Sequence, residues 1–290
     1  MKLLTVTVPC YNSQDYMEKC IQSLLPGGNR VEIIIIDDGS KDNTGKIADE
    51  YARKFPDIVR VIHQENGGHG EGINQGLKHA TGTYFKVVDS DDTLSPDFPK
   101  FLDALEECER QGGVDMVVTN YYYVHSDGDG DRSINYSAVL PENRIFTWED
   151  TKPFRVYQML TIHSSTFRTE IMRKWEQPLP KHVFYEDNLM IYQTIPYVRK
   201  MYYPLPLLDR PAGSVGAVCR SGQAPRRSDP CDGTVLYHLS LGRHHRTPAE
   251  TIHEARPVHD VRHLHSHDPA EQVRRDGCRA EKDVGDLHGL

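Results

Sequence analysis

Apolar and polar positions alternate along the first part of the chain in two different rhythms. Four mainly apolar runs of strand length lie at residues 3–8, 31–36, 58–63 and 83–88. Three stretches with helical spacing of apolar residues lie between them, at 13–25, 43–54 and 69–80. The run at 31–36 is almost continuously apolar, which is typical of a strand buried on both faces of a parallel sheet. This order predicts βαβ units and an α/β, Rossmann-like fold whose mostly parallel central sheet is flanked by helices.

The alternation continues beyond residue 90 with less regular spacing. A helix is expected over 94–111, because Ser95 and Pro96 form a start signal. Residues 114–119 are expected to form another strand, and 120–147, with three consecutive tyrosines, a hairpin or an insertion at the sheet edge. Two later segments continue the pattern, a strand-like stretch at 161–167 and a helical segment at 189–198.

Acidic residues follow two of the expected strands. The strand at 83–88 runs into D-S-D-D at 89–92, whose three carboxylates repel one another unless a cation lies between them, and the nearby sequence offers none. Mg²⁺ or Mn²⁺ would suit such a cluster, because both ions take oxygen ligands. Paired acids at 37–38 end the second strand, and ligands of open α/β sheets bind at the carboxyl ends of strands. Acids at two strand ends favour one shared site, whereas a lone D-x-D is more simply a solvated turn.

Four motifs occur in order along the first part of the chain. They are V-P-C-Y-N at 8–12, I-D-D-G-S-K-D-N-T at 36–44, the glycine-rich stretch at 66–82, and V-D-S-D-D at 88–92. Together they resemble the donor half of family 2 glycosyltransferases, which have the GT-A fold. The resemblance is strong to about residue 110 and continues weakly to about residue 208. It implies transfer of a sugar, with inversion, from a nucleoside diphosphate sugar, most often a UDP-sugar, to a glycan or lipid-linked acceptor.

The resemblance also implies roles for individual residues. The donor-binding residues that it implies are Pro9, Tyr11, Asn12, Asp38, Gly68, Asn74, Asp89 and Ser90. Among these, Asp38 is expected to contact the base and Asp89 to lie near the ribose and the metal. The implied ligands of Mn²⁺ or Mg²⁺ are Asp91, as the main ligand, and Asp89.

An acidic pair, Glu186-Asp187, directly precedes the helical segment at 189–198. In the family such a pair carries the catalytic base, and Asp187 is the member expected to deprotonate the acceptor hydroxyl. One carboxylate suffices, because the metal stabilises the departing diphosphate. The alternative is that both acids only stabilise the positive end of a helix. His163 is a candidate contact to the acceptor or to phosphate, and a purely structural histidine explains it equally well.

Two related nucleotide-binding folds fit the sequence less well. The glycines at 67–72 do not spell G-x-G-x-x-G and follow the third strand rather than the first, unlike a dinucleotide-binding fingerprint. They are expected to let the backbone pass close to a bound donor, or to form a flexible turn. Sugar nucleotidyltransferases carry a loop rich in glycine and arginine after the first strand, where this chain has P-C-Y-N at 9–12.

Composition narrows the partners and the location. A net charge of −8 argues against nucleic acid as a partner, and no apolar run approaches the length of about 20 residues that a transmembrane helix needs. Proline interrupts the start of the chain too early for a signal peptide, and Cys10, Cys20 and Cys108 lack metal-ligand spacing and are expected to be reduced. We therefore expect a cytoplasmic protein, with peripheral attachment to the inner face of the membrane if the acceptor is lipid-linked.

The sequence changes character beyond about residue 208. Residues 209–290 contain no Phe or Asn, hold most of the fifteen histidines and show no periodicity. We expect a donor-binding half at 1–112, an acceptor-binding and catalytic-base half at 113–208, and an atypical tail at 209–290. A reading-frame shift near 207–210 is the first hypothesis for the tail, and a disordered or regulatory segment is the second. If the tail replaces a region that closes the acceptor site, the chain would be a non-catalytic remnant that binds nucleotide sugars.

Overall fold

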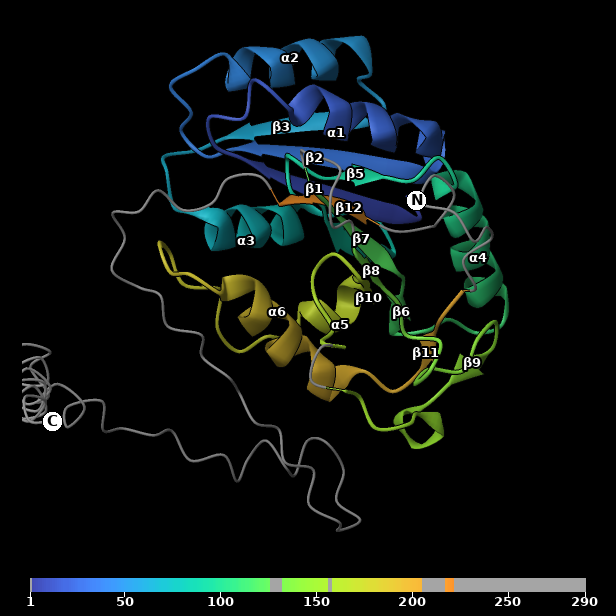
Figure 1. The fold of residues 1–290 in the computed structure, drawn as a ribbon. Helices are drawn as coiled ribbons and strands as arrows, with labels where there is room; N and C mark the ends of the chain where they lie inside the picture. The colour runs from blue at the N-terminus through green and yellow to red at the C-terminus, as the bar shows by residue number, and fades with distance from the viewer. Residues whose placement is uncertain (1, 126–131, 156–157, 205–216, 222–290) are drawn as a thin grey trace, which may run out of the picture. The chain divides into compact units, whose positions relative to one another are not determined.

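A computed structural model describes residues 2–125, 132–155, 158–204 and 217–221 (Figure 1). Its centre is an eight-stranded mixed sheet. In spatial order the strands are β3 (Val59–His63), β2 (Val31–Asp37), β1 (Leu4–Cys10), β4 (Tyr84–Val87), β10 (Ser165–Arg168), β6 (Met116–Val118), β11 (Met201–Tyr202) and β9 (Ile145–Phe146). The four strands predicted from the first apolar runs are therefore confirmed, as is the strand expected at 114–119.

The first four strands form the parallel part of the sheet. β1 pairs in parallel with β2 on one side and with β4 on the other, and every residue of these three strands is buried. β2 includes a buried charged residue near its start, Glu32, whose carboxylate accepts hydrogen bonds from Thr5 and Arg60 at 2.8 and 2.9 Å. A buried carboxylate is tolerated when such partners replace water.

Beyond β4 the sheet becomes mixed. β10 lies antiparallel between β4 and β6, and β11 then pairs in parallel with β6. The stretch predicted as a strand at 161–167 forms β10 only from Ser165, because residues before it form a turn in which the Ser164 N–H donates to the Thr161 carbonyl at 3.2 Å. A continuous sheet therefore joins the two predicted halves of the chain.

Right-handed connections place the helices on two faces of the sheet. β1, β2 and β3 follow one another in one direction, so α1 (Met17–Leu24) and α2 (Thr44–Lys54) lie on the same side (Figure 1). The step from β3 back to β4 reverses direction and places α3 (His69–His79) on the opposite side (Figure 1). The helix α4 (Phe98–Arg110) follows the acidic turn.

Two helices begin later than the sequence predicts. α1 begins at Met17 rather than at residue 13, because the Ser13 hydroxyl bonds the Ser90 hydroxyl at 2.9 Å instead of capping the helix. α4 begins at Phe98, because Ser95 accepts the Asp97 N–H in a turn that precedes the helix. Both start signals are real turns, and the Ser13 hydroxyl makes a tertiary contact whereas the Ser95 hydroxyl makes a local one.

A second, four-stranded sheet has the order β5-β12-β7-β8. Its strands are β5 (Thr93–Leu94), β12 (Ala217–Ser221), β7 (Tyr121–His125) and β8 (Arg132–Ile134). β7 and β8 are antiparallel and confirm the hairpin expected within 120–147. β12 comes from the predicted tail and pairs with β7 and β5, whereas the rest of 209–290 lies outside the described residues.

The remaining elements are short. They are the 3₁₀ turns η1 (Leu25–Arg30), η2 (Trp148–Asp150) and η3 (Ile195–Tyr197), and the helices α5 (Thr169–Met172) and α6 (Glu186–Thr194).

Cys10, Cys20 and Cys108 are buried free thiols. In the part of the chain that the structure describes, no helix has the length and apolar character needed to cross a membrane.

Candidate active site

Three neighbouring strands end at one edge of the sheet. β1 lies between β2 and β4, and the chain reverses its direction across the sheet at this point, which in open α/β sheets creates a ligand-binding crevice. The loops that leave these strands carry the predicted donor residues, Asp38 after β2, Tyr11 and Asn12 after β1, and Asp89 after β4. The structure thus brings residues from three separate motifs to the same edge.

Asp38 organises the glycine-rich loop that leads into α3. Its carboxylate is almost fully buried and accepts hydrogen bonds from the Gly67 and Gly68 N–H groups, both at 2.8 Å, and from the Gln64 amide at 2.6 Å. Gly68 has a φ of +83°, which an L-residue adopts with strain. Asp38 therefore fixes the backbone at the start of α3, and its contact with a base stays a prediction.

The loop after β1 presents one exposed aromatic ring. Tyr11 is 49% exposed, so its ring is available to a ligand at this edge. Asn12 has a φ of +51°, and its side-chain oxygen accepts the Lys41 N–H at 2.9 Å while its own N–H donates to Ser40 at 3.0 Å. These bonds tie the loop after β1 to the loop after β2 and hold Tyr11 in place.

Pro9 and Ser90 lie deeper in the same region. A Cβ atom on Gly72 would come within 3.0 Å of the Pro9 ring, so glycine there lets α3 pack directly against the end of β1. The buried Ser90 hydroxyl bonds the Ser13 hydroxyl at 2.9 Å and joins the acidic turn to the loop after β1. In this structure both residues shape the edge, and direct contact with a donor stays a prediction for each.

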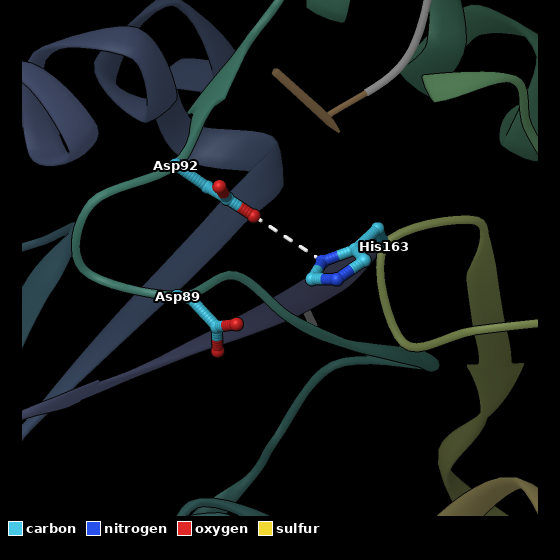
Figure 2. A group of neighbouring side chains, drawn as sticks. All are labelled: Asp89, Asp92 and His163. Carbon is cyan, nitrogen blue, oxygen red and sulfur yellow. Dashed lines mark ion pairs between the residues drawn. The ribbon is translucent and has the colours of Figure 1, made fainter. Parts of the chain in front are cut away.

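The acidic turn after β4 faces a histidine from a distant segment. Asp89, Asp92 and His163 offer ligand atoms that all lie within 4.8 Å of one another, and His163 Nδ1 lies 3.2 Å from an Asp92 oxygen (Figure 2). Asp91 lies on the same turn with its side chain exposed and outside this group. Burial, followed by the charges of Asp92 and Asp89, raises the pKa of Asp91. The turn is therefore an electronegative site that a cation would neutralise.

The expectation that no cation lies near this turn is wrong. Lys86, two residues before the turn, is buried, and its ammonium group donates to the His163 carbonyl at 2.9 Å. Burial raises the pKa of Asp89, but the charges of His69, His163 and Lys86 outweigh it and lower that pKa. Two of these three groups come from other segments of the chain, so local sequence could not reveal them.

His69 bridges the acidic turn and the predicted catalytic pair. Its Nε2 atom lies 2.9 Å from Asp89 Oδ1, and its Nδ1 atom lies 2.8 Å from Glu186 Oε1. Burial lowers the pKa of His69, but the two carboxylates outweigh burial and raise it to about 10. Sequence reasoning missed this residue, because nothing in a glycine-rich stretch marks a histidine as the partner of acids 20 and 117 positions away.

Glu186 and Asp187 form the first turn of α6. Burial raises the pKa of Glu186, but the His69 hydrogen bond outweighs it and lowers that pKa. The Asp187 carboxylate accepts a hydrogen bond from Asn188 at 3.4 Å and is partly exposed. The helix start follows Tyr185, whose φ of +66° marks an abrupt turn of the chain. The pair is close to the donor edge through Glu186, and the role of Asp187 as the base stays a prediction.

Asn74 and His163 make contacts within the protein. The Asn74 side chain donates to the Leu179 carbonyl and accepts the Leu179 N–H, both at 2.9 Å, and so holds the segment before α6 against α3. His163 is mostly buried, and its ring centroid lies 5.5 Å from that of Tyr121. Donor contact by Asn74 and acceptor contact by His163 stay predictions, and both side chains have clear structural partners.

Comparisons with known proteins agree on one family. Residues 5–174 match the family model for Glycosyl transferase family 2. The uncharacterized glycosyltransferase EpsJ of Bacillus subtilis is 36% identical over 194 residues, which are 67% of this chain and 52% of EpsJ. The glycosyltransferase GlyG of Streptococcus pneumoniae is 38% identical over 131 residues, which are 44% of this chain and 42% of GlyG. The chain therefore spans about half or less of the length of these curated relatives.

Solved structures show the same fold. Residues 1–349 of TarS from S. aureus superpose with a TM-score of 0.58 at 23% identity, covering 76% of this chain and 60% of that one. A complex of the same TarS fragment with UDP-GlcNAc superposes with a TM-score of 0.54 at 20% identity, covering 77% of this chain and 60% of that one. At this level of identity the likeness establishes a shared fold and leaves the ligand of this chain open.

Proposed function

This chain belongs to glycosyl transferase family 2 and has the GT-A fold, and from that premise we propose that it transfers a sugar from a nucleoside diphosphate sugar to an acceptor hydroxyl. The donor we propose is a UDP-sugar, and the acceptor is a glycan or a lipid-linked glycan of a cell-surface polysaccharide. The transfer inverts the anomeric centre and uses a divalent cation.

One observation carries the proposal. The acidic pair that begins α6 lies beside the acidic turn after β4, because the single imidazole of His69 contacts both Glu186 and Asp89. The two regions are far apart in sequence, and the fold brings their acids to one imidazole. A transferase needs this arrangement, since the base must lie next to the sugar that the donor site holds.

The donor-side residues support a nucleotide at the end of β1 and β2. Tyr11 exposes an aromatic ring at the edge, and Asp38 lies at the end of the neighbouring strand, where its carboxylate accepts the Gly67 and Gly68 N–H groups. We propose that Pro9, Tyr11 and Asn12 line the nucleotide pocket and that Asp38 addresses the base. Both TarS structures with a bound nucleotide contain UDP or UDP-GlcNAc, which supports a uridine donor here.

The chemical step needs one base on this chain. We propose that Asp187 accepts the proton of the acceptor hydroxyl while the hydroxyl oxygen attacks the anomeric carbon from the face opposite the diphosphate. The new C–O bond forms as the bond to the diphosphate oxygen breaks, and its electron pair leaves with the nucleotide. Asp187 suits this role because it is partly exposed, whereas Glu186 beside it is buried and bound to His69.

A divalent cation fits the acidic turn. Two carboxylates and one imidazole converge there, and a mixed set of oxygen and nitrogen ligands suits Mn²⁺ better than Mg²⁺, which prefers oxygen alone. We propose that Asp91 and Asp89 hold the ion, and that Asp92 and His163, whose ligand atoms lie within 4.8 Å of that of Asp89, are further candidate ligands. When bound, the ion would stabilise negative charge on the departing diphosphate.

Exposed apolar side chains next to the acidic pair support an acceptor with an apolar portion. Val183, Phe184 and Tyr185 are 51%, 82% and 62% exposed and directly precede Glu186. Aromatic rings stack on sugars and also bury well at a lipid surface. We propose that residues 113–208 bind the acceptor and supply the base, that residues 1–112 bind the donor, and that a lipid-linked acceptor brings the protein to the inner face of the membrane.

A donor screen tests the proposal. Nucleoside diphosphate sugars are added to the full chain with Mn²⁺, with Mg²⁺ or with a chelator, and the melting temperature is measured. A donor present at about 100 times its Kd stabilises the fold by about 2.7 kcal/mol. We expect a Mn²⁺-dependent shift with a UDP-sugar, followed by slow hydrolysis or transfer of that donor. A chain that binds the donor without any turnover would be the non-catalytic remnant instead.

A further inference from the structure

The site concentrates acids from two parts of the chain around one imidazole. The turn after β4 contributes three aspartates at 89–92, and the start of α6 contributes Glu186 and Asp187. The negative charges of these carboxylates repel one another, and the repulsion is strongest where burial excludes water. His69 lies between the two groups with one ring nitrogen on each, at 2.8 and 2.9 Å. Each carboxylate accepts only, so the ring satisfies both when it donates from both nitrogens.

The two ends of this bridge differ in their other anchors. The turn that carries Asp89 has several, because the Asp92 N–H donates to the Asp89 carbonyl at 3.0 Å and Ser90 is tied to Ser13 at 2.9 Å. In the part of the chain that the structure describes, the one side chain that hydrogen-bonds the Glu186 carboxylate is His69. Loss of His69 would therefore leave the acidic turn in place and free the Glu186 carboxylate at the start of α6.

Close packing brings the first turn of α3, which begins with His69, next to Glu186. A Cβ atom on Gly70 would lie 3.1 Å from Glu186 Cγ and 3.0 Å from the Pro180 carbonyl oxygen, which is tighter than ordinary contact, so glycine at this position favours the close approach of the first turn of α3 to the start of α6. The Gly67 carbonyl accepts the His182 N–H at 3.1 Å and aligns the same two segments. His69 begins α3, directly after Gly68, whose N–H donates to the Asp38 carboxylate at 2.8 Å.

We propose that His69 is a positioning residue for the transfer reaction, which holds the Glu186-Asp187 pair at the correct distance from the donor-side turn. This inference rests on the proposed function and adds to it a residue outside the four motifs. His69 contacts neither the reacting atoms nor the nucleotide in this scheme. It acts by fixing Glu186, and through the shared helix turn it fixes Asp187.

The test compares His69→Ala with His79→Ala in the full chain. His79 is the last residue of the same helix, far along it from the site, so the same substitution there controls for effects on α3 itself. A displacement of about 1 Å at a catalytic group costs up to about 100-fold in rate. We expect His69→Ala to lower kcat for transfer by about 10- to 100-fold with donor KM close to wild type, and His79→Ala to leave both unchanged.

Two further variants make the result specific. His69→Gln keeps one donor group and is expected to recover part of kcat, and it also serves if His69→Ala folds poorly. Glu186→Gln combined with His69→Ala should cost no more than the larger single change, because the two side chains act as one unit. Hydrogen exchange gives a readout without activity, and amides at 185–190 should exchange faster in His69→Ala than in His79→Ala.

The outcomes separate this inference from the proposed function. If the wild type turns over and both His69 variants keep its kcat, the role of His69 is overturned and the proposed function stands. A joint fall of kcat and rise of donor KM would show a general loss of structure and would also overturn positioning. If the wild type binds donor without turnover, the proposed function fails; unchanged exchange at 185–190 in His69→Ala then overturns the bridge, and faster exchange supports it.

Discussion

The proposed donor edge and the proposed acceptor side of this site are built in different ways. At the donor edge, strand ends and backbone N–H groups hold the functional side chains, as when Gly67 and Gly68 bind Asp38. On the acceptor side, Glu186 and His163 reach the site from remote segments and are held by contacts between side chains. Backbone contacts survive most substitutions, whereas a contact between two side chains is lost with either one. The acceptor side should therefore be the more easily disabled half.

The largest effect is expected from substitution of Asp187, which tests the proposed acceptor side. If Asp187 is the base, Asp187→Asn should lower the transfer rate by a factor of about 10² to 10⁴ and leave donor and Mn²⁺ affinity nearly intact. If the acid only stabilises a helix start, the rate should barely change and stability should fall by about 1 kcal/mol or less. Transfer kinetics and donor calorimetry on the same preparation decide between the two.

Glu170→Gln is the matched control for Asp187→Asn. Glu170 is an exposed acid in the first turn of α5. It occupies the same position in its helix as Asp187 does in α6, but it is not one of the candidate site residues. Its substitution is expected to leave the rate unchanged. An Asp187→Asn variant with the rate of Glu170→Gln would contradict the assignment of the base.

The next effect concerns which acids of the turn hold the cation. Loss of a group that only supports a metal ligand costs about 10- to 100-fold in metal affinity, so loss of a ligand should cost at least about 100-fold. Asp91→Asn keeps the shape and removes the charge, and we expect Mn²⁺-dependent donor binding to fall by that amount. Asp91 is exposed, so the melting temperature without metal should stay near the wild-type value.

Asp92→Asn also tests which carboxylates of the turn hold the cation. Asp92 is buried and paired with His163 at 3.2 Å, so this variant should lose stability even without metal. Calorimetry of Mn²⁺ with the donor, run on both variants, ranks the two carboxylates as ligands. Unchanged Mn²⁺-dependent donor affinity in Asp91→Asn would transfer the ligand role to Asp89, Asp92 and His163.

A smaller effect is expected from substitution of Asp38, whose carboxylate bonds to backbone N–H groups. Asp38→Ala leaves the Gly67 and Gly68 N–H groups without their acceptor, at a cost of about 1–3 kcal/mol for the buried Gly67 N–H and less for the half-buried Gly68 N–H. The melting temperature should fall and the preference for one nucleotide base should weaken, while the cation site persists. Asp38→Asn, which keeps one acceptor oxygen, should lose less of both. A full base preference in Asp38→Ala would remove Asp38 from the nucleotide pocket.

The smallest effect is a pH dependence at the end of β3. Hydrogen bonds that the His63 ring donates to Asp37 and Asp49 raise the pKa of His63 above its ordinary value of about 6.5. A raised pKa in the folded state means that this stability is fully present below about pH 6.5 and is lost as pH rises through the folded value. The ring is about half exposed, so solvent screening keeps the contribution small.

Urea unfolding across pH checks this prediction. The wild type should lose a small part of its free energy of unfolding as pH rises above about 6.5, and His63→Gln should show a flatter profile over the same range. His79→Gln serves as the control and should follow the wild type. A His63→Gln profile that parallels the wild type would show that the Asp37–His63 contact adds nothing measurable.

The donor half could be predicted from the sequence in most of its detail. The runs at 3–8 and 31–36 form β1 and β2, and the acids after β2 and β4 reach one edge, because parallel strands place their carboxyl ends together. The predicted helix starts at Ser13 and Ser95 were wrong, because each serine hydroxyl bonds a residue outside the helix instead of capping its first turn.

The glycine-rich stretch shows where interpretation of the sequence was incomplete. Its glycines were expected to make room for a ligand or to form a flexible turn. In the structure Gly70 makes room for the segment before α6, Gly72 for Pro9, and Gly76 for Thr7 in β1. A sequence indicates that a backbone position needs space, but only the fold shows what occupies that space.

By itself the sequence determined the family, the α/β fold and the candidate groups at the strand ends, because strand periodicity and short motifs are local properties of the chain. Only the tertiary structure decided that Lys86, His69 and His163 supply positive charge to the acidic turn. It also decided that Glu186 meets Asp89 through one imidazole. Those contacts depend on how α3, β10 and α6 pack against the sheet, and packing is a property of residues that the sequence places far apart.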